Sequence, residues 1–215
     1  MPTAIDNTWA GGVYFKPFDH GVDLSIQALT KYQAGHADVL AGAVLSRTAA
    51  QAKRVRATFK ELGLGLSPDD AALILRGMRT MHLRMAAQDA SARDIAAWME
   101  ARPEVAAVLH PALPSSPDHA LWARDFTGAA GLFGVVLHPV EEPRIAAMLE
   151  GYRLFSMGFS WGGYESLVIP CDPQLGQRTI PWRAVGPLLR YSIGLETTAD
   201  LIADLEAGFA RLTGS

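Results

Sequence analysis

Hydrophobic and polar positions in the first 62 residues follow the repeats of two strands and a helix. Residues 21–28 alternate between apolar and polar side chains, which predicts a strand. Residues 39–45 form a continuous apolar run, as expected for a strand buried on both faces. Residues 48–62 predict a helix that is closed by Gly63 and Gly65.

A long helical segment follows. Ser67 can cap a helix and Pro68 suits its first position, and the two aspartates that come next favour the positive end of the helix dipole. The pattern stays mostly helical to about Ala101, and no proline interrupts it before Pro103. Such a helix is long enough to link two domains. A shift in composition at residues 102–103 places the domain boundary there, which gives domains 1–101 and 102–215.

Strands and helices alternate in the remainder of the chain. The last helix, at residues 198–212, places five apolar side chains on one face: Leu201, Ile202, Leu205, Phe209 and Leu212. Alternating strands and helices predict an α/β chain. The strands are expected at residues 105–109, 132–137, 167–169 and 188–193, a proline-rich loop at 110–118, and a further helix at 141–150.

Composition and charge narrow the class of protein. Hydrophobic residues make up 49% of the 215 residues and charged residues 19%, which is a globular composition. The net charge of −3 and the lack of a Lys/Arg block argue against a nucleic-acid binder. The sequence shows neither the pattern of a signal peptide nor an apolar window of membrane-spanning length. We therefore expect a cytoplasmic protein with no membrane partner.

Cysteine and histidine usage excludes two further kinds of site. The one cysteine, Cys171, cannot form an intramolecular disulfide, fits a reducing compartment and lacks a supporting nucleophile motif. The six histidines are dispersed, so we predict no metal site. Met78, Met81 and Met85 recur at helical spacing and are expected in the core.

Lys31 and Asp6 form the most informative pair of candidate residues. Lys31 lies between two apolar stretches, and Asp6 precedes it by 25 positions at the end of an earlier apolar segment. A lysine can form a Schiff base with an aldehyde cofactor, and a carboxylate can keep the ring nitrogen of that cofactor protonated. Pyridoxal phosphate needs both groups.

Several segments together carry the pattern of one enzyme family. Residues 5–9, 19–23, 30–32 and 35–38 resemble the Cys/Met-metabolism family of pyridoxal-phosphate-dependent enzymes. Residues 155–167 resemble the active-site segment of this family, and residues 189–196 its carboxylate-binding segment. The resemblance implies the aspartate-aminotransferase type of α/β fold (fold type I). It covers only the C-terminal half of a family member. Residues 1–101 would then belong to an incomplete cofactor-binding large domain that includes the long linking helix, and residues 102–215 to the small domain.

The resemblance also implies roles for single residues. Lys31 would hold the cofactor and move the Cα proton of the substrate, and Asp6 would pair with the ring nitrogen. Thr30 would bond the cofactor phosphate, although it can also be read as a β-branched strand residue. A second hydroxyl, common in the family three residues before the lysine, is replaced here by Ala28.

Three further residues are implied to bind the substrate. Arg190 would bind its α-carboxylate, because only arginine offers a rigid two-pronged donor, and the alternative is a structural salt bridge. Ser160 could steady the lysine amine, while Trp161 would shape the pocket or simply pack.

The tryptophan at position 161 is typical of the bacterial cystathionine β-lyase branch. This branch implies a carbon–sulfur lyase of transsulfuration and methionine biosynthesis, which converts L-cystathionine to homocysteine, pyruvate and ammonia. The alternatives are the γ-lyase or γ-synthase branch and a catalytically inactive C-terminal remnant. The family also implies a homo-oligomer, a dimer or a tetramer, and a truncated chain would pair with a missing N-terminal half.

Overall fold

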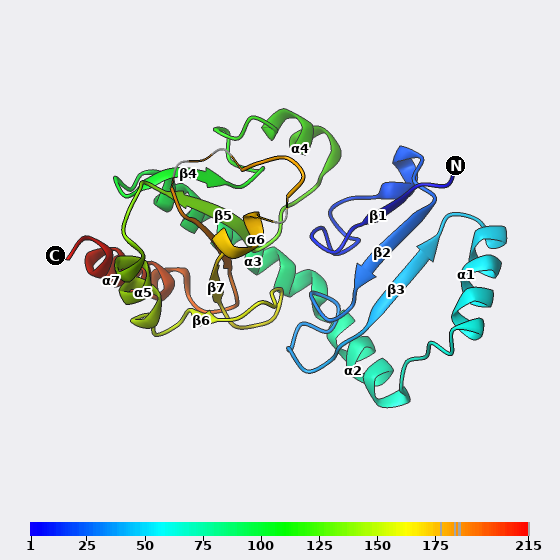
Figure 1. Cartoon of the computed structure of the whole chain (residues 1–215). Coiled ribbons are helices and arrows are strands. Elements are labelled where there is room, and N and C mark those ends of the chain that lie inside the picture. Colours follow the sequence, from blue (N-terminus) through cyan, green and yellow to red (C-terminus); the bar gives the residue numbers. More distant parts are fainter. Residues whose placement is uncertain (177, 183, 185, 215) are drawn as a thin grey trace.

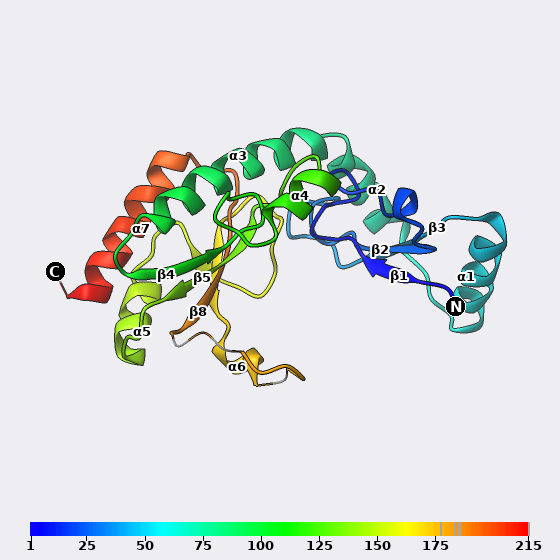
Figure 2. The ribbon, with the colours of Figure 1, turned by 90° about the horizontal axis from the view of Figure 1, so that it is seen from above.

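The chain is organised around two β-sheets, which a long helix joins (Figure 1). The computed structural model describes residues 1–176, 178–182, 184 and 186–214. The first 46 residues supply a three-stranded sheet, and residues 105–192 supply a five-stranded one. Figure 2 shows helix α3 (Met81–Glu100) running along one side of the molecule from the first sheet to the second.

The three-stranded sheet holds the start of the chain. Its central strand pairs in parallel with the first strand and antiparallel with the third. The helix that follows the sheet begins with a capping box, in which Thr48 and Gln51 bond each other's backbone N–H groups. The elements are β1 (Ala4–Asp6), the 3-10 helix η1 (Pro17–His20), β2 (Leu24–Ala28), β3 (Gly42–Ser46) and α1 (Ala49–Glu61).

The prediction of a doubly buried strand at residues 39–45 is wrong in its burial. The strand begins at Gly42, pairs with β2 alone among the described strands, and contains no buried residue. Leu45 is 46% exposed, and Leu40, just before the strand, is 89% exposed. A run of apolar residues is compatible with burial of a strand on both faces. Burial also requires other elements that pack on those faces, and the sequence of the strand does not encode them.

The predicted long helix is divided in two. Helix α2 (Pro68–Met78), which Ser67 caps, ends at Met78 with Arg79 as its C-cap, and α3 begins two residues after that cap. The backbone oxygen of Gly77 accepts the N–H of Thr80 at 3.2 Å and the Arg84 guanidinium at 2.8 Å, so a side chain adds to the bonds that satisfy this end of α2. The break turns Met78 outward, to 49% exposure, while Met81 and Met85 are buried as expected.

Among the described residues we find no helix long and apolar enough to cross a membrane.

The five-stranded sheet contains the four predicted strands and a short strand, Ser156–Met157, that was not predicted, and two short helices are added among the described residues. Its order is 4-5-8-7-6, and its neighbours pair antiparallel except for the last pair, which is parallel. One of the added helices, α4, comes directly after the proline-rich loop, and the other, α6, follows β7. The elements are β4 (Val105–Leu109), α4 (His119–Asp125), β5 (Leu132–Leu137), α5 (Glu142–Glu150), β6 (Ser156–Met157), β7 (Leu167–Pro170), α6 (Asp172–Leu175), β8 (Leu188–Ser192) and α7 (Thr198–Thr213).

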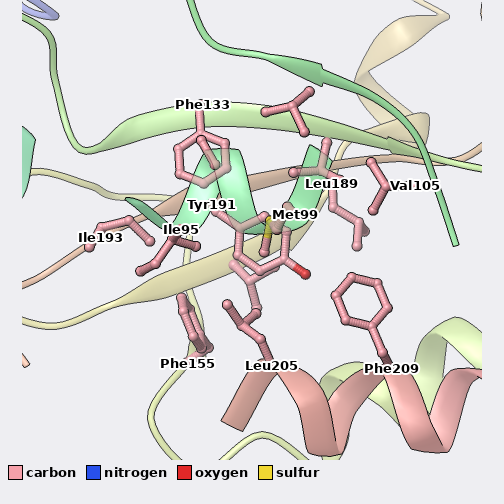
Figure 3. Packing of buried hydrophobic residues seen from close by; sticks show 14 of the residues in the cluster. Ile95, Met99, Val105, Phe133, Phe155, Leu189, Tyr191, Ile193, Leu205 and Phe209 are labelled. Carbon is pink, nitrogen blue, oxygen red and sulfur yellow. The ribbon is translucent and has the colours of Figure 1, made fainter. Parts of the chain in front are cut away.

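The main hydrophobic core lies between this sheet and the helices α3, α5 and α7 (Figure 3). Side chains from α3 and α7 meet the sheet residues Phe133, Leu189 and Tyr191, all at most 3% exposed. The predicted apolar face of the last helix is confirmed, since its residues enter this core or pack against it: Leu201, Ile202, Leu205, Phe209 and Leu212. The start of α3 instead contacts Tyr32 through Met81 and Met85. Helix α3 thus connects the lysine-bearing segment to the second sheet, whereas the division at residues 101 and 102 stays a prediction.

Candidate functional site

Lys31 lies in a tight turn that begins where β2 ends. The backbone N–H of Lys31 donates to Ala28, and its carbonyl accepts from Gly35 at 2.8 Å. Its side chain crosses to the second half of the chain, where Nζ donates to Ser160 Oγ at 3.0 Å. Nζ also lies 5.1 Å from the centre of the Trp161 ring. The structure therefore brings together three residues that the sequence placed in one site.

The surroundings of Lys31 favour the neutral amine. Partial burial lowers the pKa of Lys31, and the positive charge of Arg190 lowers it further. A lysine with a lowered pKa is more often unprotonated near neutral pH, and the unprotonated amine is the form that reacts with an aldehyde. Burial and charge thus prepare this side chain for covalent chemistry.

Arg190 extends from β8 toward the segment that carries Ser160. Its Nη2 donates to three consecutive carbonyl oxygens, those of Gly158 (3.3 Å), Phe159 (2.8 Å) and Ser160 (3.2 Å). Its Nε is buried without a partner among the described residues, where no carboxylate pairs with the guanidinium either. The structure therefore does not show the structural salt bridge that was the alternative, and it leaves a donor for an anionic ligand.

Asp6 ends strand β1 and has one oxygen engaged. Its Oδ1 accepts the backbone N–H of Thr8 at 2.9 Å and the Thr8 hydroxyl at 2.5 Å. The Thr8 hydroxyl in turn accepts the N–H of Ala28 at 2.9 Å, close before Lys31 in the chain. Within the described chain Oδ2 has no hydrogen-bond partner, so it is available to a cationic group such as a ring N–H.

Thr30 bonds to the chain itself. Its hydroxyl donates to the carbonyl of Ala41 at 3.2 Å and accepts the N–H of the same residue at 3.0 Å. Thr30 lies in the turn after β2, which ends at Ala28, so the structure does not bear out the alternative reading of Thr30 as a strand residue. Its role as a phosphate donor stays a prediction.

The sequence interpretation missed two residues that support the site. Tyr32 is 1% exposed, accepts the N–H of Gly131 on its hydroxyl at 3.1 Å, and packs edge-on against Trp161 with ring centres 5.7 Å apart. Gln88, on α3, is also 1% exposed. With Arg84 it is one of two polar residues on the buried face of that helix, and a polar residue at such a position was the available signal.

The donors and acceptors at this site fit pyridoxal phosphate. Lys31, with its lowered pKa, suits the aldehyde of that cofactor, and the free oxygen of Asp6 suits its ring nitrogen. The partnerless Nε of Arg190 suits the carboxylate of an amino acid. The α/β fold and this site are together typical of the class of enzymes that bind an aldehyde cofactor through a lysine.

Comparison with known proteins identifies the family. The model of the family described as "Cys/Met metabolism PLP-dependent enzyme" matches residues 1–210, and the chain belongs to this family. A Rhizobium johnstonii protein, provisionally named cystathionine beta-lyase, is 50% identical over 96% of this chain and 52% of its own length. The cystathionine beta-lyase of Salmonella typhimurium is 46% identical over 97% of this chain and 53% of its own length.

The solved structures agree with the fold. The cystathionine gamma synthase of Xanthomonas oryzae pv. oryzae superposes with a TM-score of 0.92 at 36% identity, over 99% of this chain and 56% of that one. The chain therefore spans about half the length of its relatives. The predicted fold class and the predicted cofactor, pyridoxal phosphate, are confirmed by the family and these relatives.

Proposed function

We propose that this chain carries the lysine half-site of a carbon–sulfur lyase that cleaves L-cystathionine by α,β-elimination to homocysteine, pyruvate and ammonia. The hydrogen bond of 3.0 Å between Lys31 and Ser160, beside Arg190, is the observation that carries the proposal. The names of the two beta-lyase relatives support the choice of substrate. Pyridoxal phosphate, when bound, supplies a ring that accepts electrons from Cα of the substrate.

Lys31 has two tasks in this proposal. Its amine would hold the cofactor aldehyde, and as a neutral amine it would take the proton from Cα of the substrate. The Ser160 hydroxyl accepts from Nζ and keeps the amine directed toward the second half of the chain. Asp6 would hold the ring nitrogen in its protonated form. The lowered pKa of Lys31 favours the neutral amine that proton removal requires.

Arg190 orients the substrate. An α-carboxylate can exchange for one of the three backbone carbonyls that Nη2 now contacts and can also use Nε. Fixing the carboxylate would restrict the orientations that the rest of the amino acid can take beside Lys31. Trp161 then bounds the space for the sulfur-bearing side chain.

A second reaction of the same family has its own support. The solved relative with the TM-score of 0.92 is a cystathionine gamma synthase, so the fold of this half accommodates γ-chemistry as well. The two reactions differ in their keto-acid product: β-elimination yields pyruvate and γ-elimination yields 2-oxobutyrate. A catalytically inactive remnant would yield neither product.

We also propose assembly into a homo-oligomer. An open groove of about 330 Å³ beside β2, β3 and α1 is lined by apolar side chains such as Ile26, Val44 and Phe59, with Arg54 among them. Exposed leucines follow at positions 62, 64 and 66. An exposed apolar surface of this kind favours binding of another protein chain, which would bury it.

The single cysteine supports a reducing compartment such as the cytoplasm.

Cofactor capture by the purified chain tests the proposal. The chain would be mixed with near-stoichiometric pyridoxal phosphate, reduced with borohydride, and digested to find the modified lysine by mass spectrometry. We expect one adduct, at Lys31, and we expect the Lys31→Arg variant to lose it while the Lys53→Arg variant keeps it. An adduct spread over the surface lysines would contradict the proposal. With L-cystathionine as substrate, pyruvate supports the β-lyase and 2-oxobutyrate overturns it.

A further inference from the structure

The loop at residues 158–163 carries both side chains that contact Lys31. It lies between β6 and β7, outside any helix or strand. Its shape therefore depends on the side chains that bond its backbone. Three of its carbonyls are held from one side by Arg190. The carbonyl of its last residue, Gly163, is held from the other side.

That second contact comes from Gln88 on α3. The amide Nε2 of Gln88 donates to the carbonyl of Gly163 at 2.7 Å and to the carbonyl of Ile193 at 3.2 Å. Both protons of the amide are thus used, one on the loop and one just beyond the end of β8, which carries Arg190. With the amide reversed, an oxygen would face two carbonyl oxygens, so the contacts fix its orientation.

The loop at residues 158–163 packs closely against Lys31 at Gly162. Gly162 is buried and has a φ of +76°, and a Cβ built on it would lie 3.3 Å from Lys31 Cβ and from the Tyr32 ring. Only glycine meets both conditions easily. A shift of the loop therefore alters the surroundings of Lys31 directly, through the Ser160 contact and through the covering backbone.

We infer that Gln88 is a positioning residue. It holds the loop at residues 158–163 over Lys31 and so maintains the positions of Ser160 and Arg190 relative to the Lys31 amine. It touches neither of the reacting groups itself. It acts through two backbone carbonyls, one on each of the segments that bring Ser160 and Arg190 to the site. The catalytic meaning of this role rests on the proposed function, but the geometric role does not.

The reactivity of Lys31 in the cofactor-free chain measures this role. Gln88→Met keeps the length of the side chain and removes both donors, so the loop loses its contact on the α3 side. Burial is the main cause of the lowered pKa of Lys31, so a loosened loop raises that pKa and leaves less neutral amine. At pH 8 we expect the rate of trace labelling with acetic anhydride at Lys31 to fall about three- to tenfold relative to exposed Lys53.

Two other variants separate positioning from stability alone. Met99→Ala opens a cavity on the same helix, at a side chain that is 0% exposed in the main core, and should lower Tm without changing the labelling of Lys31. Gln88→Glu keeps the size of the side chain and has at most one donor proton, so it should give an intermediate effect. It also serves as the test variant if Gln88→Met fails to fold.

Equal labelling of Lys31 in the wild type and both Gln88 variants, with only Tm lowered, would overturn the inference. A fall in labelling in Met99→Ala as large as that in Gln88→Met would also overturn it. Because labelling needs neither cofactor nor substrate, this result is independent of whether the chain proves to be a lyase. A chain that fails to form the Lys31 adduct with pyridoxal phosphate would refute the proposed function and leave this measurement valid.

Discussion

Lys31 and Arg190 both form hydrogen bonds with the loop at residues 158–163, at Ser160. Lys31 bonds the side chain of Ser160, while Arg190 bonds its backbone carbonyl. A positive charge near an amine opposes its protonation, so Arg190 affects the chemistry of Lys31 before any substrate arrives. Substrate binding and amine activation therefore depend on the same arginine.

Arg190→Gln should raise the pKa of Lys31, because the variant removes the neighbouring charge that favours the neutral amine. A pH series of Lys31 labelling in the cofactor-free chain measures the change, and the curve should move to higher pH. The matched control is Arg211→Gln on α7, an arginine that donates to the carbonyl of Met148 at 3.4 Å. Superimposable curves for Arg190→Gln and the wild type would contradict this account.

Individual site residues were predictable from the sequence where a motif marks them. Lys31, Ser160 and Trp161 were placed in one site and lie together in the structure. Gln88 and Tyr32 were not singled out, because their importance comes from partners that are distant in sequence: Gly163 and Ile193 for Gln88, and Gly131 for Tyr32. No local pattern encodes such partners.

At the scale of elements, the break between α2 and α3 is maintained by close packing. Gly77, in the last turn of α2, lies against the backbone of the lysine-bearing segment. A Cβ there would come within 2.2 Å of the Ala34 oxygen and 2.4 Å of the Gln33 oxygen. The glycine is therefore a contact point between the helix and the turn that follows Lys31.

Gly77→Ala should destabilise the chain, although alanine favours a helix over glycine by about 1 kcal/mol. The overlap with two backbone oxygens outweighs this gain, and we expect a net loss of about 1–3 kcal/mol in the free energy of unfolding. Urea denaturation measures it. Gly65→Ala is the control, because a Cβ there meets nothing within 4 Å, and its effect should stay within about 0.5 kcal/mol. Equal stabilities of the two variants would be evidence against this packing.

Elements with a strong hydrophobic period were predictable, and those shaped by distant contacts were not. The last helix and the strand Leu132–Leu137 lie where their patterns placed them. The break at Arg79 was missed because Arg84 and the segment around Ala34 determine it. Helix α4 was missed because seven residues after a proline-rich loop carry too little periodicity.

At the scale of the whole molecule, one buried histidine links stability to pH. His110 is 1% exposed, its Nδ1 accepts the N–H of Ala112 at 3.2 Å, and within the described chain its Nε2 has no partner. Burial, assisted by the charge of Arg93, lowers the pKa of His110 to about 4. The folded chain therefore holds this imidazole neutral where the unfolded chain would protonate it.

The free energy of unfolding should fall as the pH drops from about 6.5 to about 4, by up to a few kcal/mol from this group. In this window the unfolded state binds the extra proton, so stability rises with pH. His110→Asn keeps an acceptor for Ala112 and should flatten the dependence, while His82→Asn, at an exposed position on α3, should leave it unchanged. Urea denaturation at several pH values measures both. A wild-type slope retained in His110→Asn would sink the assignment.

The order in which the site can form follows from how far apart its residues are in the chain. Lys31 and Ser160 are separated by 129 positions, and Gln88 bonds partners 75 and 105 positions away. Local pairings such as β2 with β3 close short loops and can form early, whereas contacts of such long range incur the entropy of closing large loops. The hydrogen bond of Lys31 to Ser160 therefore belongs to the last stage of folding. A chain that misfolds in either sheet leaves its lysine in water, with the reactivity of an ordinary amine.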